Sequence, residues 1–187
     1  MAQPRLPVPQ LMKAALLTAM AILIPIVSPV KIVIPPASFT LLSHLPIFIG
    51  MFISPQVAVL VNLGASAGFL LAGFPPEIVA RALSQTIFVV IFSIYIKRYK
   101  KQISWDNPWK VQGLSFLIGC VHGAGEALAV LFFYLFIAGI PLTSQWIYHS
   151  LLGLVMAGTV IHSMFDFMIA FLIARRIQIL PPAEYKK

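Results

Sequence analysis

Long apolar runs separated by short polar or proline-rich segments make up most of this sequence. About 20 apolar residues in a helix cross the roughly 30 Å hydrocarbon core of a bilayer, and most of the runs approach or exceed that length. The pattern predicts an all-α integral membrane protein, a single domain over residues 1–187 with a six-transmembrane-helix bundle. The predicted spans are residues 11–27, 38–53, 55–72, 75–96, 111–138 and 146–173.

The segments between the runs carry the prolines and most of the polar residues. Residues 28–37 are expected to form a proline-rich loop, and His44 and Pro46 interrupt the short second span. Residues 102–108 form a polar linker between two halves. Basic residues precede the first run, as in a secretory signal, but no small-x-small cleavage site follows. We therefore expect the first run to stay as a helix.

Composition supports the membrane assignment. The chain is 60% hydrophobic and 10% charged, whereas soluble domains carry about 25% charged residues. The net charge of +8 does not indicate nucleic-acid binding, because the basic residues flank the apolar runs and form no patch with aromatic residues. A single cysteine, Cys120, excludes a disulfide framework within the chain.

The distribution of basic residues predicts the orientation. Six spans place both termini on one side of the membrane. The basic residues on that side include Lys13, those in the segment 97–101, Lys110, Arg175 and Arg176. Only Lys31 falls on the opposite side. Cytoplasmic loops are enriched in Lys and Arg, so we expect both termini to be cytoplasmic and Lys31 to be external.

Glu77 and Arg81 lie four residues apart at the start of the fourth predicted span. A guanidinium inside a bilayer costs about 2.5–3.5 kcal/mol unless it faces a partner, water or a ligand. One interpretation is a salt bridge between the two residues, one helical turn apart. The other is that Arg81 points into an external pocket and binds an anionic or polar group. The two are compatible, because a paired Arg still has spare donors.

Two His–carboxylate pairs with the same spacing occur in the last two spans: His122 with Glu126, and His162 with Asp166. Such pairs are compatible with a metal site or a proton relay, but also with buried polar links between helices, which we favour for His162 and Asp166. Glu126, nearer the membrane centre, is also a ligand candidate. No spacing of these residues is diagnostic of a metal, and no glycine-rich phosphate loop is present. We expect neither a metal nor a cofactor.

Aromatic and small residues add weaker signals. Trp146 and His149 open the last span, as members of an interfacial belt or as a surface on which a flat ligand stacks. GxxxG in the third and fifth spans, and AxxxA at Ala15 and Ala19 in the first, permit close helix packing. The AxxxA face is also a candidate docking surface for a second membrane protein.

Together these features resemble the substrate-binding S component of an energy-coupling-factor (ECF) vitamin transporter. The resemblance rests on six spans in a chain of this length, on Ala15 and Ala19 in the first helix, and on the long first external loop SPVKIVIPPA. It also rests on the block SFTLLSHLPIFIGMFISPQVAVLVNLGASAGFLLAGFPPEIVARALSQ, and it covers nearly the whole chain.

The resemblance implies a non-enzymatic protein of a prokaryotic plasma membrane that binds a small water-soluble vitamin from outside. Its implied partners are a membrane coupling (T) subunit, contacted through Ala15 and Ala19, and two ATPase subunits. The first external loop would cover the site, whose expected lining is Glu77, Arg81, Glu126, Trp146, His149 and Ser150. Niacin or pantothenate would suit Arg81, and pyridoxine or hydroxymethylpyrimidine would fit the Glu, His and Trp side chains equally well.

Two other functions stay open on the residues alone. One is a membrane-embedded metal-dependent enzyme that uses His122, Glu126, His162 and Asp166. The other is a secondary transporter that works without partners, although the two halves show no convincing inverted repeat.

Overall fold

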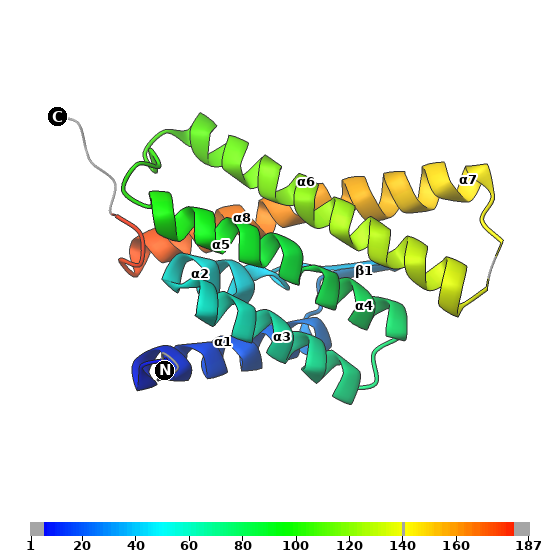
Figure 1. The fold of residues 1–187 in the computed structure, drawn as a ribbon, viewed down its shortest axis with the longest axis horizontal. Coiled ribbons are helices and arrows are strands. Elements are labelled where there is room, and N and C mark those ends of the chain that lie inside the picture. The colour runs from blue at the N-terminus through cyan, green and yellow to red at the C-terminus, as the bar shows by residue number, and fades with distance from the viewer. Residues whose placement is uncertain (1–5, 140, 182–187) are drawn as a thin grey trace, which may run out of the picture.

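A computed structural model describes residues 6–139 and 141–181. Helices dominate it, and Figure 1 shows most of them lying along the long axis of the molecule. The α-helices are α1 (Val8–Val27), α2 (Leu45–Ile53), α3 (Pro55–Leu71), α4 (Pro76–Ser84), α5 (Thr86–Tyr99), α6 (Pro108–Phe132), α7 (Ser144–Trp146) and α8 (Gly158–Arg176). Two π-helical segments, η1 (Phe133–Ile137) and η2 (Ile147–Ala157), continue α6 and join α7 to α8.

Proline and polar caps explain where several helices begin. Pro55 and Pro108 occupy the first positions of α3 and α6, where a missing N–H costs nothing. Each follows a capping residue: the Ser54 side chain accepts a hydrogen bond from the Val57 N–H, and Asn107 accepts one from the Lys110 N–H. The Ser-Pro and Asn-Pro dipeptides thus mark helix starts as well as loops.

A β-hairpin replaces the expected loop and part of the expected second span. Strands β1 (Lys31–Ile34) and β2 (Ala37–Thr40) pair antiparallel around Pro35 and Pro36, which are joined by a cis peptide bond. The helix expected over 38–53 is confined to α2, because residues 37–40 are in β2 and turns fill 41–44. The β-branched run Ile32–Ile34 favours a strand. The hairpin adds a small sheet to a fold predicted as all-α.

Both GxxxG motifs bring helices close together. A Cβ at Gly64 or Gly68 of α3 would overlap the Thr18 or Ile22 side chain of α1, respectively. Similarly, a Cβ at Gly123 of α6 would lie 2.6 Å from the backbone oxygen of Met156 in η2. At Gly123 a side chain would therefore block the approach of the two backbones, and at Gly64 and Gly68 it would require Thr18 or Ile22 to move.

The lengths and apolar character of the helices fit a membrane. Within the described residues, four helical stretches are long and apolar enough to cross one, by length and composition: Val8–Val27, Pro76–Tyr99, Pro108–Ile137 and Ser144–Arg176. Helix α3 is apolar but shorter, with 17 residues. Helix α2 has 9 residues, nearly all of them buried, so it is surrounded by other helices and is too short to cross a bilayer alone.

The basic residues gather at one end of the bundle. The start of α1, the connection from α5 to α6 and the end of α8 lie at this end, on the left in Figure 1. Polar contacts join the segments at this end. Lys100 Nζ donates to the carbonyl oxygens of Phe52 and Ile179, and Arg175 pairs with Asp106 at 2.6 Å. Burial lowers the pKa of Lys100.

Candidate ligand-binding cavity

A cavity of ≈ 140 Å³ lies between the hairpin and helices α1 to α4, α6 and α8. Its apolar wall includes Ile47, Ala65, Phe69, Phe74 and Ile78. The polar lining residues are Lys31, Ser38, Thr40, Ser43, His44, Asn62, Arg81, Gln85, Glu126, Thr159 and His162. A small space with apolar walls and a few convergent polar groups is typical of a ligand site.

The hairpin contributes one face of its strands to the cavity. Lys31 pairs with Thr40 and Val33 with Ser38, so these four side chains share a face, and all four line the cavity. On the other face, Phe39 packs against the apolar cluster formed by α6 and η2. The alternation along each strand therefore gives a charged and hydroxyl-bearing lining on one side and an anchor on the other.

Arg81 of α4 and Glu126 of α6 form a buried ion pair at the cavity wall. Arg81 Nη2 and Nε donate to Glu126 Oε2 over 2.7 and 3.0 Å, and Arg81 Nη1 donates to the Pro36 carbonyl oxygen over 3.2 Å. Both side chains are buried, with 5% and 2% of their surface exposed. Three of the five guanidinium N–H groups are used in this way within the described structure, which leaves two for a ligand.

A salt bridge between Glu77 and Arg81, one of the two interpretations of the sequence, is not found among the described residues, where Arg81 pairs with Glu126 instead. Glu77 is half-buried in the first turn of α4 and is not among the residues that line the cavity. Because Arg81 reaches a carboxylate 45 residues further along the chain, the pair ties α4 to α6 and does not merely stabilise one helix.

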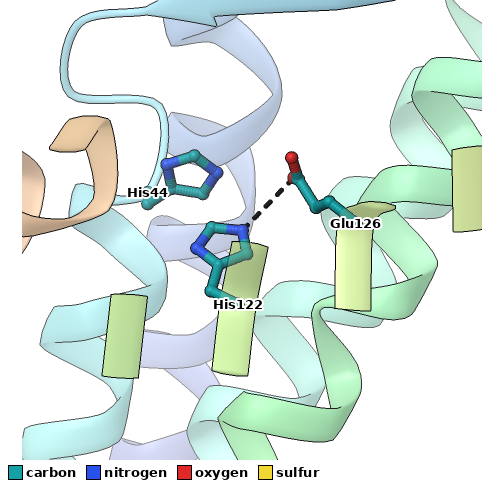
Figure 2. A group of neighbouring side chains, drawn as sticks. All are labelled: His44, His122 and Glu126. Carbon is teal, nitrogen blue, oxygen red and sulfur yellow. Dashed lines mark hydrogen bonds and ion pairs between the residues drawn. The ribbon is translucent and has the colours of Figure 1, made fainter. Parts of the chain in front are cut away.

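His44, His122 and Glu126 lie close together, as Figure 2 shows. One potential ligand atom from each lies within 4.8 Å of the others, and His44, His162 and Asp166 form a second such group. His122 Nε2 is 3.2 Å from Glu126 Oε1, and its Nδ1 is 3.2 Å from the Ser163 hydroxyl. Two histidines and a carboxylate are a known ligand set for transition metals.

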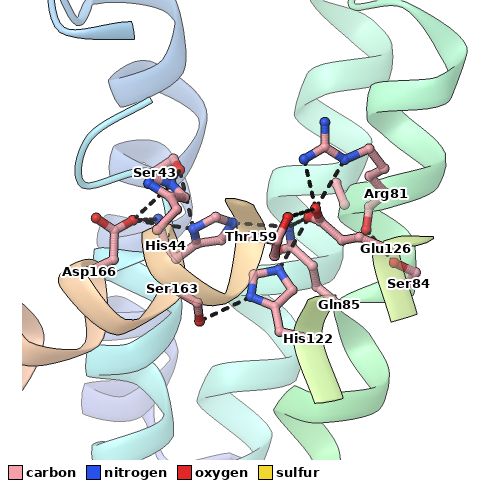
Figure 3. A network of polar contacts seen from close by, with 12 residues as sticks. Ser43, His44, Arg81, Ser84, Gln85, His122, Glu126, Thr159, Ser163 and Asp166 are labelled. Carbon is pink, nitrogen blue, oxygen red and sulfur yellow. Dashed lines mark hydrogen bonds and ion pairs between the residues drawn. The ribbon is translucent and has the colours of Figure 1, made fainter. Parts of the chain in front are cut away.

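Gln85 occupies the position between these groups and explains them without a metal (Figure 3). Its amide nitrogen lies 3.0 Å from Glu126 Oε1 and 3.1 Å from His44 Nε2, so both amide hydrogens are used. Thr159 donates to Glu126 Oε2 over 2.8 Å. Glu126 is therefore surrounded by donors from three side chains besides Arg81, and a metal would have to displace them.

Asp166 forms the other end of the same network. His44 Nδ1 donates to its Oδ2 over 3.2 Å, and the backbone N–H groups of Leu42 and His44 donate to its two oxygens over 2.9 Å each. His162 Nε2 is 3.5 Å from Oδ2 and 3.1 Å from the Ser43 hydroxyl. This fully buried carboxylate thus holds the turn between the hairpin and α2 against α8, as Figure 3 shows.

The predicted lining residues are only partly brought together. Arg81 and Glu126 meet in the cavity wall, whereas Trp146, His149 and Ser150 lie in α7 and at the start of η2 and are not among its lining residues. Trp146 is half-buried and packs on Tyr134, 5.1 Å between ring centroids, and His149 is exposed. A contact of these three residues or of Glu77 with substrate stays a prediction.

The expected docking residues lie on the outer face of α1. Ala15 and Ala19 are exposed, whereas Ala14, Leu17 and Ala21 on the opposite face are buried against the bundle. Several large apolar side chains on α1 are exposed as well, among them Leu11, Met12, Leu16 and Leu23.

Sequence reasoning missed three residues that shape the cavity. Lys31 was used only to predict orientation, and His44 only as an interruption of an apolar run. Gln85 was not singled out, although it lies four residues after Arg81 and hence on the same helix face. A polar residue one turn from a charge inside an apolar run is the signal that would have identified it.

Long apolar helices around a cavity with an internal ion pair define an integral membrane protein that binds a small solute. The chain is 37% identical over 157 residues to the niacin transporter NiaX of Lactococcus lactis subsp. cremoris (strain MG1363), a match that covers 84% of this chain and 69% of that relative. The chain therefore belongs to the family of membrane vitamin transporters that includes this protein, and the resemblance to an S component is confirmed. No family model and no solved structure matches it.

Proposed function

We propose that this protein is the S component of an ATP-driven ECF transporter and binds niacin, as the nicotinate anion, from outside the cell. The observation that carries the proposal is the charge balance of the cavity. Glu126 is neutralised by Arg81, and Lys31 adds a positive charge that makes no salt bridge among the described residues. A cavity with one surplus positive charge favours a ligand with one negative charge.

The cavity walls and volume favour a single aromatic ring. Phe69 and Phe74 lie 4.9 Å apart between ring centroids, and both line the cavity. The ≈ 140 Å³ volume is below the 300–1,000 Å³ that is typical for drug-sized ligands. Nicotinate has one ring and one carboxylate, and the name of the relative from Lactococcus lactis independently favours niacin.

One observation favours pantothenate as a second candidate. Asn62 lines the cavity, and its Oδ1 has no hydrogen-bond partner among the described residues. A buried acceptor of this kind suits a ligand with a hydroxyl or amide donor, which pantothenate has and nicotinate lacks. Pantothenate is longer than nicotinate, however, and would need a larger cavity.

Equilibrium binding to the purified protein tests the proposal. Nicotinate should bind at least tenfold more tightly than nicotinamide, which has the same ring and no charge, and more tightly than pantothenate or pyridoxine. Mass spectrometry of ligand co-purified from cells checks the result without a choice of probe. Preferred binding of an uncharged vitamin would overturn the charge argument. Preferred binding of pantothenate would make pantothenate the substrate and Asn62 the acceptor for its hydroxyl or amide donor.

The proposed topology has both termini in the cytoplasm and the hairpin outside. The concentration of Lys and Arg at the end that holds the α5–α6 connection supports this orientation. The hairpin would then cover the cavity from the external side, with Lys31 at the entrance. A six-span count requires α2 and α3 to span the bilayer as a packed pair, because α2 is too short to do so alone.

We propose that the outer face of α1 binds the membrane coupling subunit, which two ATPase subunits drive. Ala15→Trp should abolish co-purification with the coupling subunit and vitamin uptake, while the affinity for nicotinate stays unchanged. Leu128→Trp, at a position on α6 with 65% of its surface exposed, is the matched control and should assemble normally. Normal assembly of the Ala15→Trp variant would exclude this face as the docking surface.

The metal-dependent enzyme is the less favoured alternative, because hydrogen bonds already use the potential ligand atoms. Protein stripped of metal with a chelator should bind nicotinate as well as untreated protein does. Loss of binding that Zn²⁺ restores would favour the metal site instead. Uptake by the purified chain alone, in liposomes without coupling or ATPase subunits, would favour a secondary transporter.

A further inference from the structure

A second hollow lies at the basic end of the bundle, away from the vitamin cavity. It is a groove of ≈ 500 Å³ between α5, α6 and the connection that joins them. Its floor and sides include Ile91 and Phe92 from α5 and Leu114 and Leu117 from α6. None of the groove's lining residues lines the vitamin cavity, so the groove is a separate feature.

The lining changes in chemical character along the groove. On α6, Leu117 and Leu114 are followed toward the helix start by Gly113 and then Lys110, a span of about 10 Å at 1.5 Å per residue. On α5, Ile91 is followed by Tyr95 and Tyr99, at intervals of one turn. Both helices therefore run from apolar to polar in the same direction along the groove, and Gln102 and Ser104 complete its polar end.

The polar end carries a positive charge that the protein does not neutralise. The Lys110 ammonium group donates to the Ser104 hydroxyl over 3.4 Å and forms no salt bridge within residues 6–139 and 141–181. The acidic residue of the same connection, Asp106, is paired with Arg175. Lys97, Arg98 and Lys101 are exposed nearby in the sequence and add to the positive field.

Gly113 keeps the middle of the groove open. A Cβ at this position would meet no atom within 4 Å, in contrast to those at Gly119 and Gly123 on the same helix, which face tight helix contacts. The absence of a side chain at Gly113 therefore creates space next to Lys110 and is not needed for helix packing.

From these observations we propose that the groove binds one anionic phospholipid of the surrounding bilayer. An acyl chain would lie along Ile91, Phe92, Leu114 and Leu117, and the phosphate would face Lys110 and Ser104. A phospholipid has the same order of apolar chain, ester region and anionic head group as the groove lining, and basic pockets at the ends of membrane helices bind such head groups. The proposal goes beyond vitamin binding and depends only on the membrane location of the protein.

Native mass spectrometry of the purified protein tests the proposal. The probes are dioleoyl-phosphatidylglycerol and dioleoyl-phosphatidylcholine at equal concentration, which share acyl chains and differ in head-group charge. Wild-type protein should retain one phosphatidylglycerol in preference to phosphatidylcholine. Lys110→Gln should reduce the retained phosphatidylglycerol about fivefold, as expected for one lysine at a membrane surface. Lys97→Gln removes the same charge at an exposed position of α5 that does not line the groove, and it should have little effect.

Gly113→Trp tests the apolar part of the groove. The new side chain should fill the open space and reduce the retention of phosphatidylglycerol to the level of phosphatidylcholine, and its thermal melting should match that of wild type. Equal retention of the two lipids by wild type would overturn the proposal. So would an equal loss in the Lys97→Gln and Lys110→Gln variants, which would indicate a diffuse surface field. If Gly113→Trp does not fold, the comparison of the two lysine variants decides alone.

Discussion

The two His–carboxylate pairs have the same spacing but different surroundings. Glu126 on α6 pairs with a guanidinium and lines the cavity, whereas Asp166 on α8 accepts hydrogen bonds from backbone N–H groups and is not among the lining residues. Of the two histidines, His162 lines the cavity and His122 does not. Glu126 has a cationic partner, Arg81, at 2.7 Å. Asp166 has no Lys or Arg partner within the described part of the chain and accepts hydrogen bonds from the backbone N–H groups of Leu42 and His44 and from the His44 ring.

The difference separates a ligand site from a structural clamp. The carboxylate with a cationic partner lines the cavity, and the guanidinium beside it retains free donors. Asp166 is fully buried and satisfied by the turn that starts α2, so it joins α8 to the hairpin. We therefore propose that the two carboxylates, each four residues after a histidine, have different roles: Glu126 in ligand binding and Asp166 in folding.

The largest effect is expected when Arg81 is removed. Arg81→Gln leaves Glu126 buried and unpaired, which typically costs 3–5 kcal/mol, and should abolish nicotinate binding. The double variant Arg81→Gln/Glu126→Gln removes both charges and should recover most of the stability but not the binding. Denaturation in detergent and equilibrium binding measure the two effects. Nicotinate binding restored by the double variant would exclude a direct role for Arg81.

A smaller effect, on stability alone, is expected when Asp166, at the other end of the polar network, is changed. Asp166→Asn places an amide NH₂ against N–H donors of the turn and should cost about 2–3 kcal/mol, because hydrogen bonds to a charged group are lost. Nicotinate affinity should change less than threefold. The control is Asp106→Asn, at a side chain 48% exposed, which should cost less than about 1 kcal/mol. A tenfold loss of affinity at unchanged stability would make Asp166 part of the ligand site.

The smallest effect is expected at Lys31. Lys31→Gln should weaken nicotinate binding about fivefold, corresponding to about 1 kcal/mol for a solvent-accessible charge pair, without a change in thermal stability. Nicotinamide binding should stay the same, since the amide carries no charge. Lys13→Gln, exposed on α1 outside the cavity, is the control. If both ligands lose affinity equally, Lys31 supports the hairpin and does not recognise the carboxylate.

The sequence predicted the apolar helices well because their signal is local. Length and apolar character alone indicate Val8–Val27 and the three longer helical stretches. The first residue of α6, Pro108, was assigned to the polar linker, because the apolar run begins only at 111. The hairpin was missed because prolines favour a loop interpretation, although Ile32, Val33 and Ile34 have high strand propensity. The short α2 was extended to 38 because apolar residues continue into β2.

The cavity was harder to predict because its residues are distant in sequence. The cost of a buried guanidinium indicated that Arg81 needs a partner, but no local pattern distinguishes Glu126 from the nearer Glu77. Likewise, the role of Gln85 depends on His44, 41 residues earlier, and on Glu126, 41 residues later. Such pairings follow from how the helices pack, which single-sequence periodicity does not define.

The close fit of α1 on α3 has a mechanical consequence. Thr18 and Ile22 fill the space left by Gly64 and Gly68, so rotation or sliding of α1 along α3 would require these packed side chains to move. The exposed Ala15 and Ala19 therefore keep a constant direction relative to the cavity wall. If the coupling subunit binds this face as proposed, we expect a tilt imposed on α1 to pass through the packed side chains to α3, which contributes Asn62, Ala65 and Phe69 to the cavity wall.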